Sequence, residues 1–163
     1  MPLDLYIPDD GVIRFDFLMI KYLPHYDRTW GDLGYAKPGD AGFDLRAAID
    51  APLEIYPGRR RLVPCGVKIA IPDGYEIQVR SRSGLSSKQG LIVLNAPGTI
   101  DAGYRGEIFA LMHNTDPDPQ VIQPGDRVAQ GVLAKVGYLA FVETDELPDS
   151  ARGETGFGSS GVR

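Results

Sequence analysis

Residues 53–81, LEIYPGRRRLVPCGVKIAIPDGYEIQVRS, decide the fold class of this chain. In YEIQVR the apolar Tyr75, Ile77 and Val79 alternate with polar residues, and VKIAI repeats the same period of two. Such alternation is typical of strands that bury one face. Pro-Gly and Asp-Gly pairs lie between the runs and favour tight turns. The stretch therefore predicts short strands joined by turns.

The same pattern continues outward in both directions. Further β-like runs are AGFDLRAAI, LIVL, EIFALMHN and VIQPGDRVAQGVLAKV, whereas SSKQG could carry one short helical turn. The 20 glycines and 13 prolines are spread along the chain rather than clustered. Many turns between short strands are typical of β-sandwiches and β-barrels. We therefore expect an all-β fold.

Length and composition indicate one globular domain. The chain has 163 residues, of which 43% are hydrophobic and 24% charged, values that are ordinary for a single folded core. The net charge of -5 argues against a nucleic acid polymer as partner, because such binding needs clustered Lys and Arg. The sequence has no long apolar run and no signal-peptide pattern, so we expect no membrane association. The lone Cys65 favours a reducing, cytoplasmic setting.

The two ends of the chain are harder to interpret. FDFLMIKYL, at 15–23, predicts a first strand, and PHYDRTWGDLGYAKPGD predicts a long loop after it. ARGETGFGSSGVR, at the C-terminus, contains almost nothing that could pack into a core. Composition alone therefore predicts a disordered tail.

Most common catalytic motifs are absent from the sequence. It contains no Walker A loop, no HExxH, no GxSxG and no paired cysteines. His25 and His113 lack metal-ligand spacing, and we expect structural or surface roles for both. Asp44 must point away from the core if its neighbours Phe43 and Leu45 point into it. What remains is a set of polar, glycine-rich patches at strand ends.

Two of these patches lie in the middle of the chain. RSRSGLSSK, at 80–88, offers a guanidinium, a hydroxyl and a glycine amide in succession, which suits phosphate oxygens, although a solvated turn would look similar. NAPGTIDAGYRGEI, at 95–108, could be a hairpin with Gly103 at a positive φ. A bare hairpin leaves four residues unexplained: Asn95, Asp101, Tyr104 and Arg105.

Two more patches follow toward the C-terminus. In PGDRVAQGVL, Asp126 follows a turn and Gln130 lies inside a strand with small and apolar neighbours. A buried amide without partners costs about 1–3 kcal/mol, so Gln130 makes either a structural hydrogen bond or a ligand contact. The last patch combines a cation, an aromatic ring and small donors that could close over a nucleotide. Its members are Arg152, Phe157, Gly158, Ser159 and Ser160.

Taken in order, these segments resemble the five motifs of the trimeric deoxyuridine triphosphatase (dUTPase) family. They are AGFDLRA, RSG within RSRSGLSSK, NAPGTIDAGYRGEI, GDRVAQGVL and RGETGFGSSG, and they cover nearly everything from Ala41 to Gly161. The resemblance implies a jelly-roll-like β-barrel that assembles as a homotrimer, with each active site built from more than one chain. It implies an N-terminal extension with the first strand at 1–35, the barrel at 36–148, and a flexible arm at 149–163 that closes the site.

The resemblance also implies a reaction. It is the hydrolysis of dUTP to dUMP and pyrophosphate with Mg2+, which limits uracil entry into DNA and supplies dUMP for thymidylate synthesis. Asp101 matches the general base that orients a water for in-line attack on the α-phosphorus, in a reaction class dominated by positioning and electrostatics. Asp44 matches the acid that holds Mg2+ through water, and this cation does keep several waters.

Base and sugar contacts follow from the third motif. Asn95 matches the residue whose amide reads the uracil edge, beside the main chain of Gly98, Thr99 and Ile100. Tyr104 matches the ring that packs under the sugar and leaves no room for a 2′-hydroxyl.

Phosphate contacts follow from the other motifs. The matching residues of the barrel are Arg82, Ser83, Gly84 and Gln130. In the C-terminal arm, Phe157 would stack on the uracil, and four residues would close on the β- and γ-phosphates: Arg152, Gly158, Ser159 and Ser160. The resemblance thus replaces the disordered tail by a lid that is mobile until the nucleotide binds.

Two alternatives stay open. The first is a dCTP deaminase or a bifunctional relative, which shares the fold and parts of the motifs, but deamination needs a glutamate in the strand where this chain has Leu111. A non-catalytic nucleotide-binding regulatory module on the same scaffold is the other alternative, although Asp101 and the fifth motif are intact. Arg105 has no assigned role beyond a structural or subunit contact.

Overall fold

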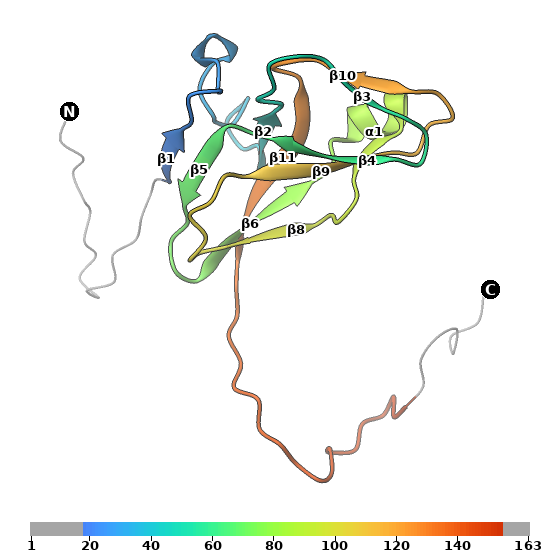
Figure 1. Ribbon diagram of the computed structural model, residues 1–163. Helices are drawn as coiled ribbons and strands as arrows, with labels where there is room; N and C mark the ends of the chain where they lie inside the picture. Colours follow the sequence, from blue (N-terminus) through green and yellow to red (C-terminus); the bar gives the residue numbers. More distant parts are fainter. Residues whose placement is uncertain (1–17, 155–163) are drawn as a thin grey trace, which may run out of the picture.

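The computed structural model describes residues 18–154, and the regular secondary structure of this part of the chain consists mostly of strands (Figure 1). Its helical elements are the 3-10 helix η1 at Arg28–Trp30 and the helix α1 at Ser83–Gln89. The strands are β1 Met19–Tyr22, β2 Gly42–Arg46, β3 Leu53–Ile55, β4 Arg60–Pro64, β5 Val67–Ala70, β6 Tyr75–Arg80, β7 Leu91–Val93, β8 Gly98–Asp101, β9 Phe109–Asn114, β10 Gln120–Ile122 and β11 Arg127–Lys135. The all-β prediction is confirmed.

The strands form four antiparallel sheets that enclose one core. The largest has the order β2-β11-β6-β8, and a three-stranded sheet has the order β4-β9-β7. Two-stranded pairs, β1 with β5 and β10 with β3, complete the jelly-roll-like barrel. Strands adjacent in sequence mostly lie in different sheets, so the chain crosses repeatedly over the core (Figure 1).

Alternation in the sequence corresponds to burial in the fold. Ile77 and Val79 of β6 and Val67 and Ile69 of β5 are at most 3% exposed, whereas their strand neighbours are not buried. Phe43 and Leu45 are also buried, so the prediction that Asp44 points away from the core is confirmed. The alternating runs therefore supply the core on one face and leave polar side chains on the other.

The N-terminal loop packs onto the barrel. Within 15–23, the described residues form β1, which pairs with β5 as the predicted first strand. The long loop that follows buries Tyr26, which is 5% exposed and packs edge-on against Trp30. Trp30 in turn covers Gly125, where an added Cβ would lie 2.7 Å from the indole nitrogen. Aromatic packing and hydrogen bonds such as Leu23 N to Gly66 O, at 2.8 Å, thus hold the loop together.

Two local predictions need correction. The helix is longer than the turn expected at SSKQG, because α1 begins at Ser83 and ends where Gly90 adopts a φ of 60°. Segment 95–108 does connect an antiparallel pair, β7 with β9, and it also contains a strand of its own, β8, which pairs with β6 in the four-stranded sheet. Gly103 does not have a positive φ. The turn there closes through Tyr104 N donating to Asp101 O at 3.0 Å, and common turns of this kind keep negative φ at both central residues.

No helix within residues 18–154 is long and apolar enough to cross a membrane.

The packing of Gly131 gives a test of the barrel. Gly131 of β11 lies opposite Phe43 of β2, and an added Cβ would come within 2.4 Å of the buried ring. Gly131→Ala should therefore destabilise the fold by about 1–3 kcal/mol, as other overpacked core substitutions do. A fall in the thermal unfolding midpoint measures this effect.

Gly137→Ala is the matched control, because no atom lies within 4 Å of a Cβ at that position. Equal midpoints for the two variants would contradict the close packing of Gly131 against Phe43.

Candidate active site

One open pocket of about 420 Å³ brings together residues from three of the sequence motifs. The predicted residues that line it are Asp44, Arg82, Ser83, Gly84 and Gln130. Strand β11 explains the grouping, because Gln130 pairs with Asp44 on one side and with Arg80 on the other. Arg82 follows two residues later, at the start of α1. Segments 38 or more residues apart in the sequence thus meet across three adjacent strands.

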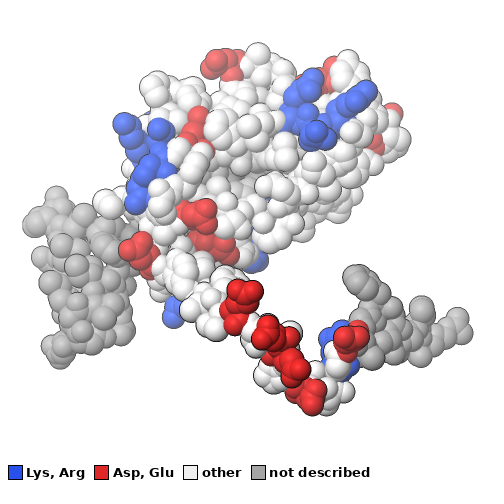
Figure 2. All heavy atoms as spheres, turned by 60° about the horizontal axis from the view of Figure 1, so that its bottom comes forward, with Lys and Arg blue, Asp and Glu red and all other residues white. Residues whose placement is uncertain are grey.

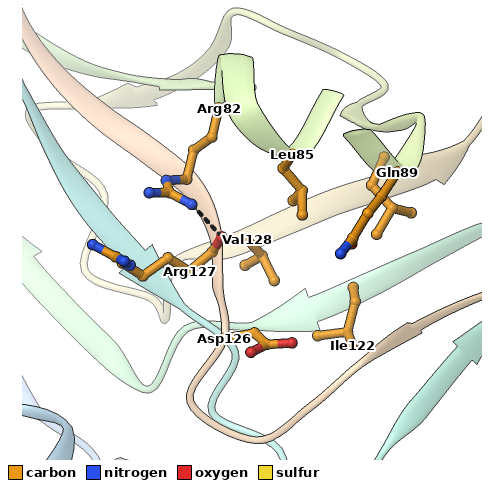
Figure 3. A pocket seen from close by; sticks show the side chains of 8 residues that line it. Arg82, Leu85, Gln89, Ile122, Asp126, Arg127 and Val128 are labelled. Carbon is orange, nitrogen blue, oxygen red and sulfur yellow. Dashed lines mark hydrogen bonds between the residues drawn. The ribbon is translucent and has the colours of Figure 1, made fainter. Parts of the chain in front are cut away.

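Two arginines hold the carboxylate of Asp44 inside this pocket. Arg82 Nε lies 2.8 Å from Asp44 Oδ1, and Arg127 Nη1 lies 3.3 Å from Asp44 Oδ2. Arg82 Nη1 also donates to the main-chain oxygen of Arg127 at 3.1 Å (Figure 3). One carboxylate thus faces two guanidinium groups. Phosphate oxygens could replace the carboxylate as acceptors for both guanidinium groups.

Gln130 makes the structural hydrogen bond that its position in the strand required. Its Nε2 donates to Ser81 O at 2.9 Å, while the side chain also lines the pocket. Its Oε1 occupies the space beside Gly42, where a Cβ would lie 2.4 Å away. Gly42 is therefore needed to admit the amide, and the amide is held in a fixed orientation.

A second, smaller hollow of about 210 Å³ adjoins the pocket behind Arg82 and Arg127. Figure 3 shows Leu85, Ile122 and Val128 pointing into it from three different elements. Arg82, Gln89, Asp126 and Arg127 supply the polar part of its lining. Asp126 closes its edge, and its Oδ2 accepts from Gln123 N at 2.8 Å, so this aspartate caps the turn before β11.

Sequence reasoning missed Arg127 and Asp40, which also line the pocket. Simple alternation would put Arg127 on the opposite face from Gln130, three positions away. The register of β11 against β2 shifts between Arg127 and Ala129, and such a bulge re-aims the side chain. Asp40 lies in an irregular loop, where its Oδ2 accepts from Lys37 N at 2.9 Å. No periodic pattern could have found it.

Segment 95–108 lies elsewhere on the same sheet. Asp101 pairs with Glu76, whereas Gln130 pairs with Arg80, which is four residues further along β6. At about 3.3 Å per residue the two positions are roughly 13 Å apart along the strand. Among the described residues that line the pocket, none comes from this segment. Within one chain, the arginine pocket and segment 95–108 are therefore two separate parts of the predicted site.

The third motif has its own geometry. Strand β8 is the outermost strand of its sheet, so part of its main chain has no strand partner. Asn95 Nδ2 lies over Gly98 of this strand, 3.0 Å from where a Cβ would be. Asp101 is exposed at the end of β8, and Tyr104 is 41% exposed. One short segment thus carries the Asn95 amide, the main-chain edge of β8, the Asp101 carboxylate and the Tyr104 ring.

Other predicted residues have structural contacts. His25 Nε2 lies 2.8 Å from Glu107 Oε1, and His113 Nδ1 lies 3.1 Å from Arg59 O. Arg105 donates to the main-chain oxygens of Ala102 and Tyr104, so it holds its own turn. These contacts agree with the structural roles expected for the two histidines.

Burial excludes the lone cysteine from the chemistry. It raises the pKa of the Cys65 thiol to about 12, with Glu107 adding to the effect, and a buried neutral thiol is not a nucleophile.

Most of the predicted site residues of the C-terminal arm lie outside residues 18–154. Arg152 is exposed, whereas Phe157, Gly158, Ser159 and Ser160 lie outside residues 18–154. Within that range no group of three or more His, Cys, Asp or Glu side chains could hold a metal ion by itself.

Comparison with known proteins identifies the family. A family model described as dUTPase matches residues 28–161. The chain belongs to the dUTPase family. It is 54% identical over 128 residues to a deoxyuridine 5'-triphosphate nucleotidohydrolase of Chlamydia trachomatis serovar L2, a match that covers 78% of this chain and 88% of that protein. It is 56% identical to the Thermobifida fusca protein of the same name, with 78% and 70% covered.

A solved structure of the same family has the same fold. The Staphylococcus bacteriophage 80alpha dUTPase with dUPNHPP superposes with a TM-score of 0.76 at 27% identity, covering 91% of this chain and all of that one. The family assignment made from the five motifs is thus confirmed.

Arg127 provides a test of the pocket. Hydrogen bonds to charged groups contribute about 1.5–3 kcal/mol, and Arg127 is half exposed, so Arg127→Ala should weaken the binding of pyrophosphate by about tenfold. Isothermal titration calorimetry measures the dissociation constant.

Arg61→Ala is the control, because Arg61 is an exposed arginine of β4 in the other sheet. Equal affinities for pyrophosphate in both variants would show that Arg127 does not contact polyphosphate.

Proposed function

We propose that this chain hydrolyses dUTP to dUMP and pyrophosphate. The observation that carries the proposal is the pocket in which Arg82 and Arg127 compete for one carboxylate, Asp44, in a member of the dUTPase family. A triphosphate supplies acceptors for both arginines and releases that carboxylate. In the cell the reaction limits uracil entry into DNA and supplies dUMP for thymidylate synthesis, and we place it in the cytoplasm.

Each active site in this proposal combines two or more chains. Asp101 lies too far along β6 from the arginine pocket to act on a phosphate bound there in the same chain. A neighbouring copy can bring its 95–108 segment to the pocket. The assembly is a homotrimer, in agreement with the resemblance.

An exposed apolar surface supports such an assembly. On the outer face of the sheet β4-β9-β7, Leu62 is 58% exposed and pairs with Leu111, and Phe109 is 36% exposed beside them. Contiguous apolar surface of this kind marks an interface. We propose that this face packs against the other two copies.

The C-terminal segment is the second support for the assembly. After β11 it runs away from the sheets (Figure 1), and Tyr138, Leu139, Phe141 and Val142 are 75–99% exposed. Acidic side chains follow them along the same segment (Figure 2). Apolar side chains this exposed need a surface to pack on, and a neighbouring copy provides it. Residues 149–163 then close over the nucleotide as a lid, with Phe157 on the uracil.

Asp101 does the chemistry in this account. Its carboxylate orients a water and accepts its proton as the water oxygen attacks the α-phosphorus in line. The bond from the α-phosphorus to the bridging oxygen breaks, and pyrophosphate leaves. Arg82, Arg127 and Gln130, with Ser83 and Gly84, stabilise the charge of the phosphates. Positioning and charge neutralisation supply most of the rate in this class of reaction.

The uracil is read by Asn95 and the free edge of β8. Uracil has an O4 acceptor and an N3–H donor, and cytosine reverses both. A site that pairs with one base leaves buried polar groups unpaired with the other, which can discriminate by about 10^4 or more. The side-chain amide and the main chain of Gly98, Thr99 and Ile100 offer donors and acceptors side by side.

The donor set of the pocket fits Mg2+ bound mainly through the nucleotide. Asp44 and Asp40 are the carboxylates in the pocket lining, too few for a cage of protein ligands. Mg2+ accepts this arrangement because it keeps waters and binds substrate phosphates. Asp44 would hold the ion through water once its arginines turn to the phosphates. Bound there, the ion would neutralise phosphate charge and fix the triphosphate conformation.

A substrate panel tests the proposed function. The chain with Mg2+ should release pyrophosphate and dUMP from dUTP, and should leave dCTP, UTP and dTTP nearly unchanged. Leu111 is apolar and half buried on β9, so it cannot move protons for a deamination. A uracil product from dCTP would instead favour the deaminase, and no turnover of any nucleotide would favour the non-catalytic module.

Asp101→Asn separates binding from chemistry. It should keep dUTP affinity within about threefold and lower kcat by about a hundredfold or more, since general bases contribute roughly 10^2–10^4. Equilibrium titration with dUTP and single-turnover kinetics measure the two quantities. Asp73→Asn, in the turn before β6, is the control for an exposed aspartate. A loss of affinity as large as the loss of rate would contradict the assigned role.

Leu62→Asp tests the assembly. A charge on the proposed interface should convert trimers to monomers and abolish dUTP hydrolysis, and light scattering measures the mass. Val121→Asp, on an exposed apolar position of β10, should leave the mass unchanged. A trimeric and active Leu62→Asp variant would exclude this face from the interface.

A further inference from the structure

The ring of Tyr104 is held in place by its own segment. Tyr104 Oη donates to the main-chain oxygen of Glu107 at 2.8 Å, and Tyr104 N donates to Asp101 O at 3.0 Å. Gly106 lies directly under the ring, where a Cβ would be 2.2 Å from the hydroxyl oxygen and 2.4 Å from Cζ. The ring can occupy this place only because position 106 has no side chain.

Glu107 is anchored at its other end. Its Oε1 accepts from Gly66 N and from His25 Nε2, both at 2.8 Å, and its side chain is 15% exposed. Only glycine fits at position 66, because its φ is 66° and a Cβ there would lie 2.7 Å from Ala48 Cβ.

The N-terminal loop completes the anchor. Leu23 N donates to Gly66 O at 2.8 Å, and Tyr26, three residues on, is buried with its hydroxyl donating to Gly31 O. His25 lies between these fixed points and reaches Glu107 across 82 residues of sequence. The contacts run without a gap from the loop, through Gly66 and Glu107, to the hydroxyl of Tyr104.

We propose that Gly106 and Glu107 are positioning residues that set the choice of deoxyribose over ribose, with His25 as the outer anchor. The proposal rests on the proposed function, in which the Tyr104 ring packs under the sugar. The hydrogen bond to Glu107 O holds the ring against the main chain of Gly106, so the ring cannot move away from a 2′-hydroxyl. Its own hydroxyl proton is already donated to Glu107 O, so it is not offered to the ribose. The 2′-hydroxyl would be buried without a partner, which is unfavourable.

The first test compares two glycines of the same turn. Gly106→Ala should push the ring aside and lower the ratio of kcat/KM for dUTP to kcat/KM for UTP by about tenfold or more, because an apolar wall rejects an added hydroxyl by only about a hundredfold in all. Gly103→Ala should leave the ratio unchanged, since no atom lies within 4 Å of a Cβ there and its φ is not positive.

Tyr104→Phe provides a second variant in case Gly106→Ala fails to fold. It removes only the hydroxyl that bonds to Glu107 O, and it should lower the same ratio while leaving the thermal unfolding midpoint near that of the wild type. An unchanged ratio in a folded Gly106→Ala or Tyr104→Phe variant would overturn the proposal.

The contacts of Glu107 with Gly66 and His25 are tested by comparing a conservative substitution with two apolar ones. Glu107→Gln keeps an oxygen acceptor for Gly66 N and should retain the ratio within about threefold, whereas Glu107→Leu and His25→Leu should lower it. A purely structural role would lower the unfolding midpoint and slow both substrates equally, which would leave the ratio intact and overturn the anchor. No turnover of dUTP by the wild type would instead overturn the proposed function, and this proposal with it.

Discussion

The pairing of β11 with both β2 and β6 is the constraint on which the rest of the structure depends. It sets Gln130 between Asp44 and Arg80, and so brings three separate motifs to one pocket. The pairing needs close contact, because the buried ring of Phe43 lies where a side chain at Gly131 would be. The bulge near the start of β11 then turns Arg127 into the same pocket. Core packing and the proposed phosphate contacts therefore share one strand.

The same sheet holds apart two groups that the proposed reaction needs together, the arginine pocket and Asp101. Strand β6 carries the arginine pocket at one end and, through β8, the carboxylate of Asp101 at the other. A single chain cannot shorten this distance without breaking its hydrogen bonds. In the proposed homotrimer, a neighbouring copy supplies the distant half of the site and also covers the apolar outer face and the extended C-terminal segment. In this account, assembly is a requirement of the active site rather than an addition to it.

Much of the fold could be predicted from local sequence. Alternation in VKIAI and YEIQVR gave the strands and their buried faces, because period two translates directly into burial. The order of five short motifs then predicted which residues would share a pocket, and Asp44, Arg82 and Gln130 do meet.

What escaped prediction depends on contacts that are distant in sequence. The partner of β8 is β6 rather than its neighbour in the chain, so this strand inside the connection between β7 and β9 was not expected. Arg127 was missed because a bulge breaks the alternation that the prediction assumed. Glu107 gave no signal, since its carboxylate is paired with groups 41 and 82 residues away. Such pairings follow from the packing of loops, and no local pattern records them.

Complementation between two inactive chains tests the central claim most directly. Asp101→Asn and Arg82→Ala chains are co-expressed with different tags, and trimers that contain both are purified. If every site takes its carboxylate and its arginine from different copies, each mixed trimer has one intact site and should recover about a third of wild-type dUTP hydrolysis. Mixed trimers as inactive as either parent would contradict the account, because they would place both residues in the same chain.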